Sequence, residues 1–284
     1  MQPKVELNKI RSFSETIDDS ILFFKQNWKP LLKAYFTICG FFWVTSLLLG
    51  TFNQFNSFKL QDQGESIFGL TYFLSAVFEL VNYAMVFLTT LSYITIYQQK
   101  EKEAPTVEEV WGYVKFYFFR VTGSFILVSL LVAVGLVMCF IPGIYLGPIM
   151  ALVLTIMIVE NTSLRYAFSR SFRLISDSWW YTFGVIFMMS LIIAISMLLF
   201  VIPAAAIASV IVFITGTHAR EIYMTAMTIT LHLVQFLHIM VLIAIALVYY
   251  NLTEQKEDLT LLQRIQMFGQ HTPQTQQPPA EEEY

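Results

Sequence analysis

The chain contains six apolar runs that are long enough to form transmembrane helices. They cover residues 31–52, 69–97, 119–140, 144–160, 179–202 and 223–251. A hydrocarbon core of about 30 Å takes about 20 helical residues to cross, so the fourth run lies at the lower limit. Ile141-Pro142-Gly143, between the third and fourth runs, predicts a tight break and therefore a helical hairpin. The predicted fold is an all-α, polytopic transmembrane bundle of about six spans.

Residues 203–221 allow more than one interpretation. The apolar part, Ala204 to Thr215, is too short to cross a bilayer. It predicts a re-entrant or interfacial segment, or a continuation of the fifth helix beyond Pro203. A seventh span is the competing interpretation.

The basic residues favour six spans over seven. With six spans, all of the 17 Lys and Arg residues except Lys59 and Arg220 fall on one side. Basic residues near helix ends stay in the cytoplasm, so both termini are predicted to be cytoplasmic. A seventh span would move Lys256 and Arg264 to the other side and weaken this bias.

An amphipathic segment precedes two of the predicted hairpins at matching positions. A shift of 151 residues places Ile17, Ile21, Phe24 and Trp28 on Phe168, Phe172, Ile175 and Trp179. The spacing of four, three and four puts each set on one helical face. A weaker copy consists of Val110, Val114, Tyr117 and Val121.

The ends of the hairpins also match, at a shift of 156 residues that places Leu91 and Tyr93 on Leu247 and Tyr249. The pattern predicts three parallel-repeat units, each an amphipathic helix followed by a transmembrane hairpin. The units cover residues 14–103, 106–161 and 163–259, within a single membrane domain of residues 1–266. Residues 267–284, rich in Pro and Gln, predict a disordered cytoplasmic tail.

Composition supports the membrane assignment. Hydrophobic residues make up 56% of the chain and charged residues only 13%, whereas soluble domains carry about 25% charged residues. This excludes an ordinary soluble domain, and with it a nucleic-acid partner. Membrane lipids are the expected partners, together with possible proteins in the membrane, and the oligomeric state stays open.

Several motifs resemble those of a known group of proteins. They are Phe140-Ile141-Pro142-Gly143-Ile144-Tyr145-Leu146, Glu160-Asn161, the stretch from Ala167 to Leu174, and Tyr249-Tyr250-Asn251-Leu252 with Glu254-Gln255-Lys256-Glu257. They resemble motifs of uncharacterised bacterial multi-pass membrane proteins related to the membrane domain of glycerophosphoryl diester phosphodiesterases. The resemblance implies a helical fold in the bacterial cytoplasmic (inner) membrane. It implies no activity, because the catalytic barrel of those enzymes has no counterpart in this sequence.

Polar side chains inside the apolar runs are the sharpest candidates for a site, because they are costly in a bilayer. Glu79 and Asn82 lie near the middle of the second run, and Gln235 and His238 near the middle of the sixth. Each pair has i, i+3 spacing and presents one polar face. The four predict a binding site or proton relay, or hydrogen bonds that fix the packing. His232 lies one turn earlier on a similar side.

Three arginines are candidates for contact with lipid headgroups: Arg165, Arg170 and Arg173. A basic residue near an anionic membrane surface contributes about 1 kcal/mol, although these residues can equally reflect the orientation rule alone. His232 and His238 lack the i, i+4 spacing of a helical metal pair. We therefore expect no metal and no cofactor.

The sequence favours a non-enzymatic membrane protein that scaffolds or assists a membrane complex. The alternative is a transporter or permease that uses the polar residues of the second and sixth spans. Lipid-modifying catalysis ranks last, because no nucleophile and base are paired in the sequence.

Overall fold

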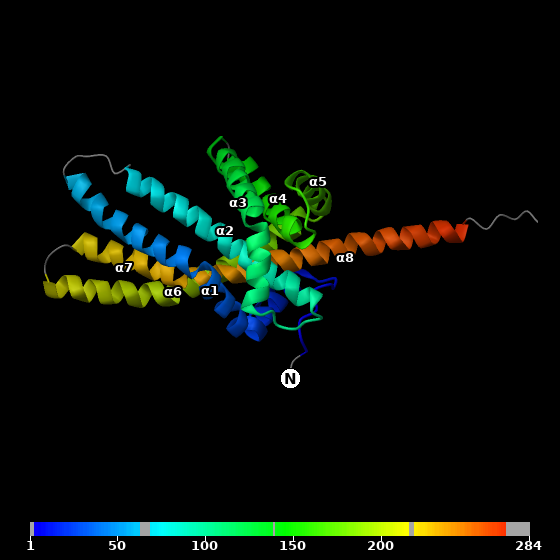
Figure 1. The fold of residues 1–284 in the computed structure, drawn as a ribbon, viewed down its shortest axis with the longest axis horizontal. Helices are drawn as coiled ribbons and strands as arrows, with labels where there is room; N and C mark the ends of the chain where they lie inside the picture. The colour runs from blue at the N-terminus through cyan, green and yellow to red at the C-terminus, as the bar shows by residue number, and fades with distance from the viewer. Residues whose placement is uncertain (1–2, 63–68, 139, 216–218, 271–284) are drawn as a thin grey trace, which may run out of the picture.

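The computed structural model describes residues 3–62, 69–138, 140–215 and 219–270. Over these residues it contains helices and no strand (Figure 1). The elements are α1 (Phe13–Asp62), α2 (Leu70–Gln99), α3 (Val107–Met138), α4 (Phe140–Val159), α5 (Leu164–Ile175), α6 (Trp179–Thr215), α7 (Ala219–Val234), the 3₁₀ turn η1 (Gln235–His238) and α8 (Ile239–Gln270).

The described residues contain six helical stretches that are long and apolar enough to cross a membrane. They correspond in order to the six runs of the sequence, and they indicate a multi-pass membrane protein. The sixth stretch, Glu221–Glu257, comprises most of α7, the turn η1 and the first part of α8. Most of the helices extend beyond the apolar runs: α1 already begins at Phe13, and α6 continues to Thr215.

Two predicted breaks take a different form in the structure. Ile141-Pro142-Gly143 does not form a turn but lies in the first turn of α4, where a proline costs little because its missing N–H would have no helical partner. Pro203 lies inside α6, which runs unbroken to Thr215. The helix-continuation interpretation of residues 203–215 is therefore confirmed, and the re-entrant and seventh-span interpretations are wrong for these residues.

The second helix of each hairpin lies at the centre of the molecule. In their most apolar parts, the second, fourth and sixth stretches have 50%, 61% and 50% of their residues buried, against 33%, 17% and 17% for the first, third and fifth. The central segments are Ala84 to Tyr97 in α2, Ile149 to Ile158 in α4 and Ile243 to Leu252 in α8, where nearly every side chain is buried. A helix that is apolar on all sides is typical of such an interior position.

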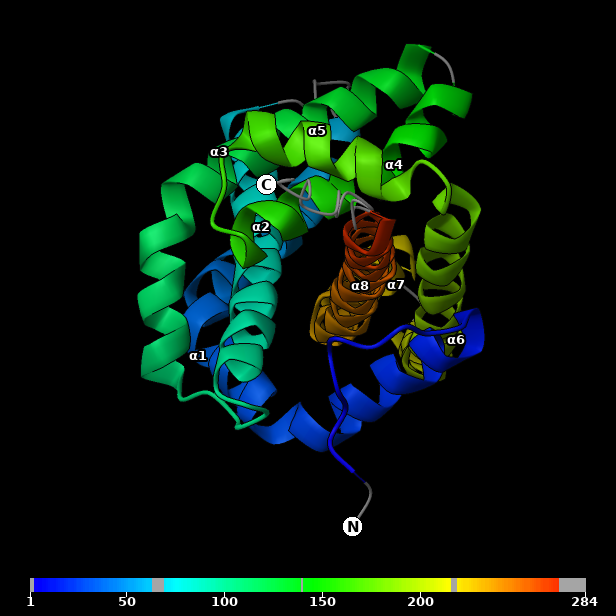
Figure 2. The same ribbon diagram turned by 90° about the vertical axis from the view of Figure 1, so that its right-hand side faces the viewer.

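The three inner helices α2, α4 and α8 contact one another. Seen along α8, the other helices surround it (Figure 2). The outer positions belong to α1, α3 and α6, so the same inner and outer division recurs in each of the three predicted repeat units. We call this central region, where the three units meet, the base.

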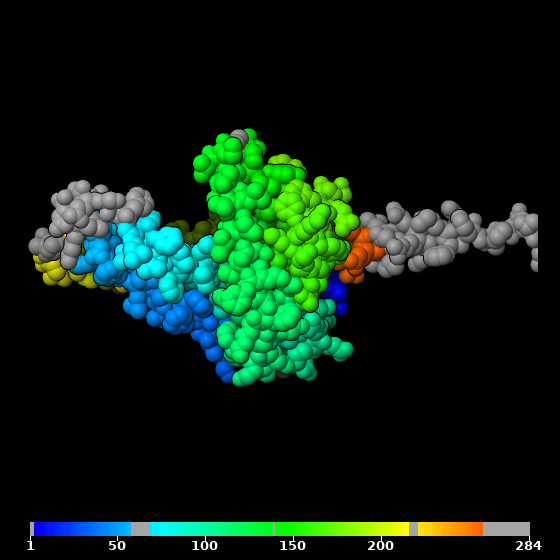
Figure 3. All heavy atoms as spheres, turned by 45° about the horizontal axis from the view of Figure 1, so that its top comes forward, coloured from blue at the N-terminus to red at the C-terminus, as the bar shows by residue number. Residues whose placement is uncertain are grey.

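The hairpins project from the base in different directions. The α1–α2 and α6–α7 hairpins both extend to the left in Figure 1, whereas the α3–α4 hairpin points upward. A space-filling view shows that hairpin standing out from the body (Figure 3). In α1, which bends on its way out of the base, Pro30 lies inside the helix, and proline is a common cause of such bends.

In the amphipathic segment of α1, the apolar face found in the sequence is not the face that is most deeply buried. In α1 the buried residues are Thr16, Ser20, Phe23 and Asn27. The predicted face of Ile17, Ile21, Phe24 and Trp28 is only partly buried or exposed. In α5 the buried residues are Ala167, Ser171 and Leu174, each one position before a residue of the predicted apolar face, together with Ile175 of that face. In α3 the residues of the matching face, Val110, Val114, Tyr117 and Val121, are all buried.

The end of the chain differs slightly from the predicted boundary. The helix α8 continues through Gln270 and so includes residues 267–270 of the predicted tail. The rest of the predicted tail, residues 271–284, lies outside the described residues.

Candidate functional site

The polar residues predicted in the second and sixth spans come together around one side chain, Gln235. Its Nε2 donates to Glu79 Oε1 at 3.2 Å, and its Oε1 accepts from Asn82 Nδ2 at 3.3 Å. Asn82 is completely buried and Gln235 is 5% exposed. The amide of Gln235 therefore bridges two residues of α2 that lie one turn apart, as their i, i+3 spacing requires.

The histidine of this cluster is His232 rather than His238. Its Nε2 lies 3.5 Å from Glu79 Oε2, an ion-pair distance when the ring is protonated. His238 instead places Nδ1 3.0 Å from the carbonyl oxygen of Gln235. Because η1 is a 3₁₀ turn, residues i and i+3 eclipse, which puts the His238 ring over the Gln235 backbone. No contact between His238 and Glu79 or Asn82 is found among the described residues, so the prediction that His238 joins them is not confirmed.

The cluster coincides with a break in the helix. Where α7 passes into η1, Trp43 Nε1 of α1 donates to the His232 carbonyl at 3.1 Å. The helices α1 and α7 can approach closely here because Gly50 of α1 faces the His232 ring. A Cβ at Gly50 would lie 3.5 Å from His232 Cε1. A mid-helix 3₁₀ turn often marks a functional hinge.

Three polar atoms at this site are buried and have no hydrogen-bond partner among the described residues. They are Ser46 Oγ, Asn82 Oδ1 and His232 Nε2, the last of which has only its 3.5 Å ion-pair contact with Glu79 Oε2. Buried polar atoms are almost always satisfied, if necessary by ordered water or a ligand. The Glu79, Asn82, His232 and Gln235 cluster, which we call the intramembrane site, therefore has unused capacity to bind water or a small polar group.

A first polar network fixes the N-terminal segment to the base. The Arg11 side chain is fully buried; its Nε donates to Asp19 Oδ2 at 2.8 Å and its Nη1 to the carbonyl of Leu7 at 2.8 Å. It also bonds the carbonyls of Glu6 and Lys9. One guanidinium thus satisfies a carboxylate and three backbone carbonyls.

Asn251 joins this network to α8. Its Oδ1 accepts from the backbone N–H of Arg11 at 2.9 Å, and its Nδ2 donates to Tyr181 Oη of α6 at 2.6 Å. Tyr181 Oη in turn lies 2.6 Å from Thr16 Oγ1 of α1. Asn251 is completely buried, so the network connects the first and third units through a dry contact.

A second network connects α4, α5 and α8. Glu160 accepts from Arg170 Nε at 2.5 Å and from Tyr249 Oη at 2.8 Å, while Arg170 Nη2 donates to Glu257 at 3.2 Å. Partial burial disfavours the charge of Arg170, but hydrogen bonding and attraction to Glu160 outweigh it and raise the arginine pKa above its ordinary value. Arg170 is therefore engaged by carboxylates, whereas Arg165 and Arg173 are exposed and their predicted lipid contacts stay a prediction.

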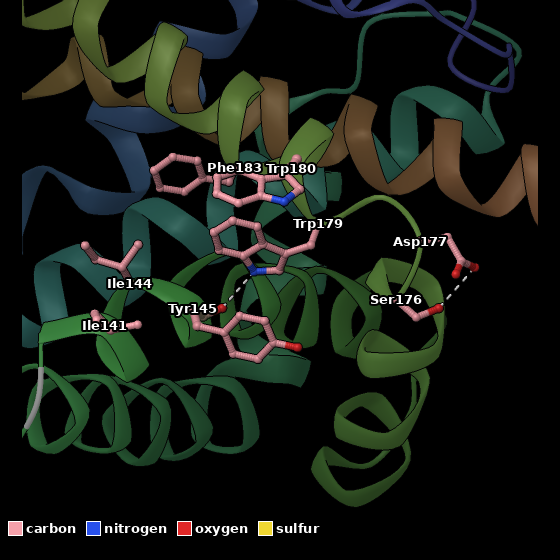
Figure 4. A pocket seen from close by; sticks show the side chains of 8 residues that line it. All are labelled: Ile141, Ile144, Tyr145, Ser176, Asp177, Trp179, Trp180 and Phe183. Carbon is pink, nitrogen blue, oxygen red and sulfur yellow. Dashed lines mark hydrogen bonds between the residues drawn. The ribbon is translucent and has the colours of Figure 1, made fainter.

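A pocket with aromatic walls lies between the first turns of α4 and the start of α6 (Figure 4). Its volume is about 610 Å³ and its lining includes Ile141, Tyr145, Asp177, Trp179 and Phe183. The Tyr145 and Trp179 rings stack 5.5 Å apart, and Trp179 Nε1 donates to the Tyr145 carbonyl at 3.0 Å. Sequence reasoning did not predict this pocket, because its two walls are far apart along the chain.

Within the described residues, no group of three or more His, Cys, Asp or Glu side chains is placed to hold a metal ion. The sequence also missed the roles of Arg11 and Asn251. A signal for part of the base was present, because Glu160, Arg170, Tyr249 and Asn251 all belong to the motifs that carry the family resemblance. In the structure these residues make contacts between the end of α4, α5, α6, α8 and the N-terminal segment.

No known protein family, no curated protein and no solved structure matches the chain. The resemblance to membrane proteins related to phosphodiesterase membrane domains accordingly stays a hypothesis based on its motifs.

Proposed function

We propose that this protein is a non-catalytic, multi-pass protein of the bacterial cytoplasmic membrane that scaffolds or assists a membrane complex. In this proposal the base and both termini lie on the cytoplasmic side. The observation that carries it is the contrast between a firmly connected base and outer helices with long uncovered apolar faces.

The contrast is largest in α3 and α6. Only 17% of the most apolar window of each is buried, and Leu199 and Phe213 of α6 are 73% and 89% exposed. In a membrane such faces are covered by lipid or by the helices of partner proteins, since helices associate in membranes by close packing. The buried polar networks hold the units together at the base. The outer helices therefore keep fixed positions relative to one another, and partner proteins bound to them would be held in a fixed arrangement.

A photo-reactive amino acid placed at Leu199 tests this proposal. On irradiation of native membranes, we expect it to yield a discrete protein adduct heavier than the 32.8 kDa chain. Ile193, on the same helix but only 3% exposed, is the matched control and should give no such adduct. Adducts to lipid alone at Leu199, or the same adduct from both positions, would contradict a partner on this face.

The intramembrane site favours a second candidate function, transport. An ionisable residue inside the membrane is by default a functional hypothesis, and broken helices with polar groups near the bilayer midplane are characteristic of transporters. Here Glu79, His232 and the η1 turn occupy one place. Because both side chains can exchange a proton, proton movement is the first flux to measure.

Purified protein in liposomes with a trapped pH-sensitive dye provides the measurement. If the protein transports, an imposed K⁺ diffusion potential should drive proton flux that Glu79→Gln and His232→Ala each reduce at least tenfold. His238→Ala should leave the flux unchanged, because the hydrogen bond described for that ring goes to the backbone of its own turn and not to Glu79. Equal flux in all variants, or no flux in the wild type, would remove this candidate.

A further inference from the structure

We infer that the α3–α4 hairpin does not cross the bilayer but enters one leaflet and leaves it on the side where α5 lies. Its partner is the acyl-chain layer of that leaflet. This inference goes beyond the scaffold proposal and does not depend on it, since it concerns only where the second hairpin ends.

The pocket of Figure 4 carries the inference, because it brings together residues that a six-span topology separates. If α3 and α4 both crossed, Ile141 would lie on the far side of the membrane from Asp177, which precedes α6. Yet Ile141, Ile144 and Tyr145 line the same pocket as Asp177 and Trp179. The two groups must therefore lie at about the same depth.

The polar turn before α6 belongs at the aqueous surface. The side chain of Asp177 is 84% exposed and lies 3.3 Å from Lys256 Nζ, which also donates to Ser176 Oγ at 3.2 Å. Charged side chains this exposed are costly inside hydrocarbon. Since Tyr145 accepts a hydrogen bond from Trp179, the first turns of α4 lie close to that surface.

The helix α5 runs back alongside α4 and gives a second measure of depth. Ser171 Oγ donates to the carbonyl of Ile149 at 2.7 Å. Arg165 lines a hollow together with Leu127, Leu131 and Met150. An exposed arginine thus lies beside the middle of the hairpin, where a spanning hairpin would have only lipid or apolar side chains.

The part of the hairpin that projects beyond these polar residues is short. At about 1.5 Å per residue, α4 rises only about 8 Å between Phe140 and Tyr145, against about 30 Å for the hydrocarbon core. The first hairpin is different. Trp111 lines a pocket with Met85 of α2, and α2 extends from there to Leu70, about 22 Å farther.

The tip of the hairpin has the surface expected of a lipid-inserted segment. Val137 is 88% exposed, Met138 83%, Phe140 69% and Ile141 76%. The sequence carries no charged residue between Arg120 and Glu160. Gly135 and Gly143 let the two helices close tightly, with a Cβ at Gly135 lying 3.3 Å from Gly143 Cα, so the tip is a narrow apolar wedge.

Single cysteines in a background with Cys39 and Cys139 replaced by alanine test the inference. Met138→Cys marks the hairpin tip, Gly69→Cys the start of α2 and Ser12→Cys the start of α1. In intact cells a membrane-impermeant maleimide should label Gly69→Cys and leave Met138→Cys and Ser12→Cys at least tenfold less labelled. Labelling of Met138→Cys equal to that of Gly69→Cys would overturn the inference.

A spin label at Met138→Cys in lipid nanodiscs identifies what covers the tip. Lipid contact predicts high accessibility to oxygen and low accessibility to a water-soluble nickel complex. Low accessibility to both reagents would point to a covering protein segment, and high nickel accessibility to water; either result would overturn the lipid assignment. The photo-reactive residue at Leu199 reports on α6 alone. Failure of the scaffold proposal can therefore be distinguished from failure of this inference about the α3–α4 hairpin.

Discussion

Replacing Arg11 with methionine should lower the free energy of unfolding by about 3 kcal/mol, because breaking a buried ion pair by removing one partner leaves the other uncompensated. The Arg11 side chain is fully buried and Asp19 is 24% exposed. The expected loss therefore lies at the lower end of the range of about 3–5 kcal/mol for breaking a buried ion pair. The change also removes the side-chain donor to the carbonyls of Glu6, Leu7 and Lys9. The Leu7 carbonyl still accepts from the backbone N–H of Lys9 at 3.0 Å. Denaturation of purified protein in mixed micelles measures the effect.

Lys9→Met is the matched control for this substitution. Lys9 pairs with Glu15 at 3.3 Å, but the two side chains are 47% and 50% exposed. Exposed pairs contribute about 0–1 kcal/mol, so the control should stay close to the wild type. A similar loss in both variants would mean that the buried network around Arg11 is not what holds the N-terminal segment on the base.

Gly143→Val should destabilise the protein by about 3 kcal/mol, the upper end of the cost of overpacking a closely packed site. A Cβ at Gly143 would lie 2.4 Å from the Leu136 side chain and 2.7 Å from the Leu136 backbone nitrogen. A side chain could move aside, but a helix backbone cannot without separating α3 from α4. We expect a lower melting temperature and opening of the hairpin, measured by the distance between spin labels on its two helices.

Gly147→Val provides the control for Gly143→Val, since it makes the same change one turn later in α4. A Cβ at Gly147 would meet nothing within 4 Å. Its stability should match the wild type within the error of the measurement. If Gly147→Val were as damaging as Gly143→Val, the loss would come from valine in this helix and not from the contact with Leu136.

The sequence located the helices well because an apolar run long enough to cross a membrane is a local property. The sequence did not determine where a helix ends when a proline was the only indication of the end. Pro142 and Pro203 look alike in the sequence, yet Pro142 occupies a first turn and Pro203 lies within α6. The sequence also did not indicate which side of α1 is buried. The buried Thr16 and Asn27 bond Tyr181 and Tyr93, which lie far away in the chain, while Ser20 bonds the Thr16 carbonyl of its own helix.

Three members of the intramembrane site, Glu79, Asn82 and Gln235, were predictable because polar residues stand out in apolar runs and the repeat related them. The choice of histidine was not predictable. It depends on the 3₁₀ turn from Gln235 to His238, which changes the direction of side chains after Val234. Arg11 and Asn251 were missed as base contacts because their hydrogen bond joins residues at opposite ends of the chain.

The central claim is that the base lies on one side of the membrane and that the α1–α2 and α6–α7 hairpins cross the membrane from it. The most direct test is to find on which side of the membrane three single cysteines are accessible. Ser12→Cys and Glu103→Cys lie at the base, before α1 and between α2 and α3, and Gly69→Cys lies at the outer end of α2. In intact cells an impermeant maleimide should label Gly69→Cys alone, and all three after permeabilisation. Labelling of Ser12→Cys and Glu103→Cys from opposite sides would contradict the arrangement.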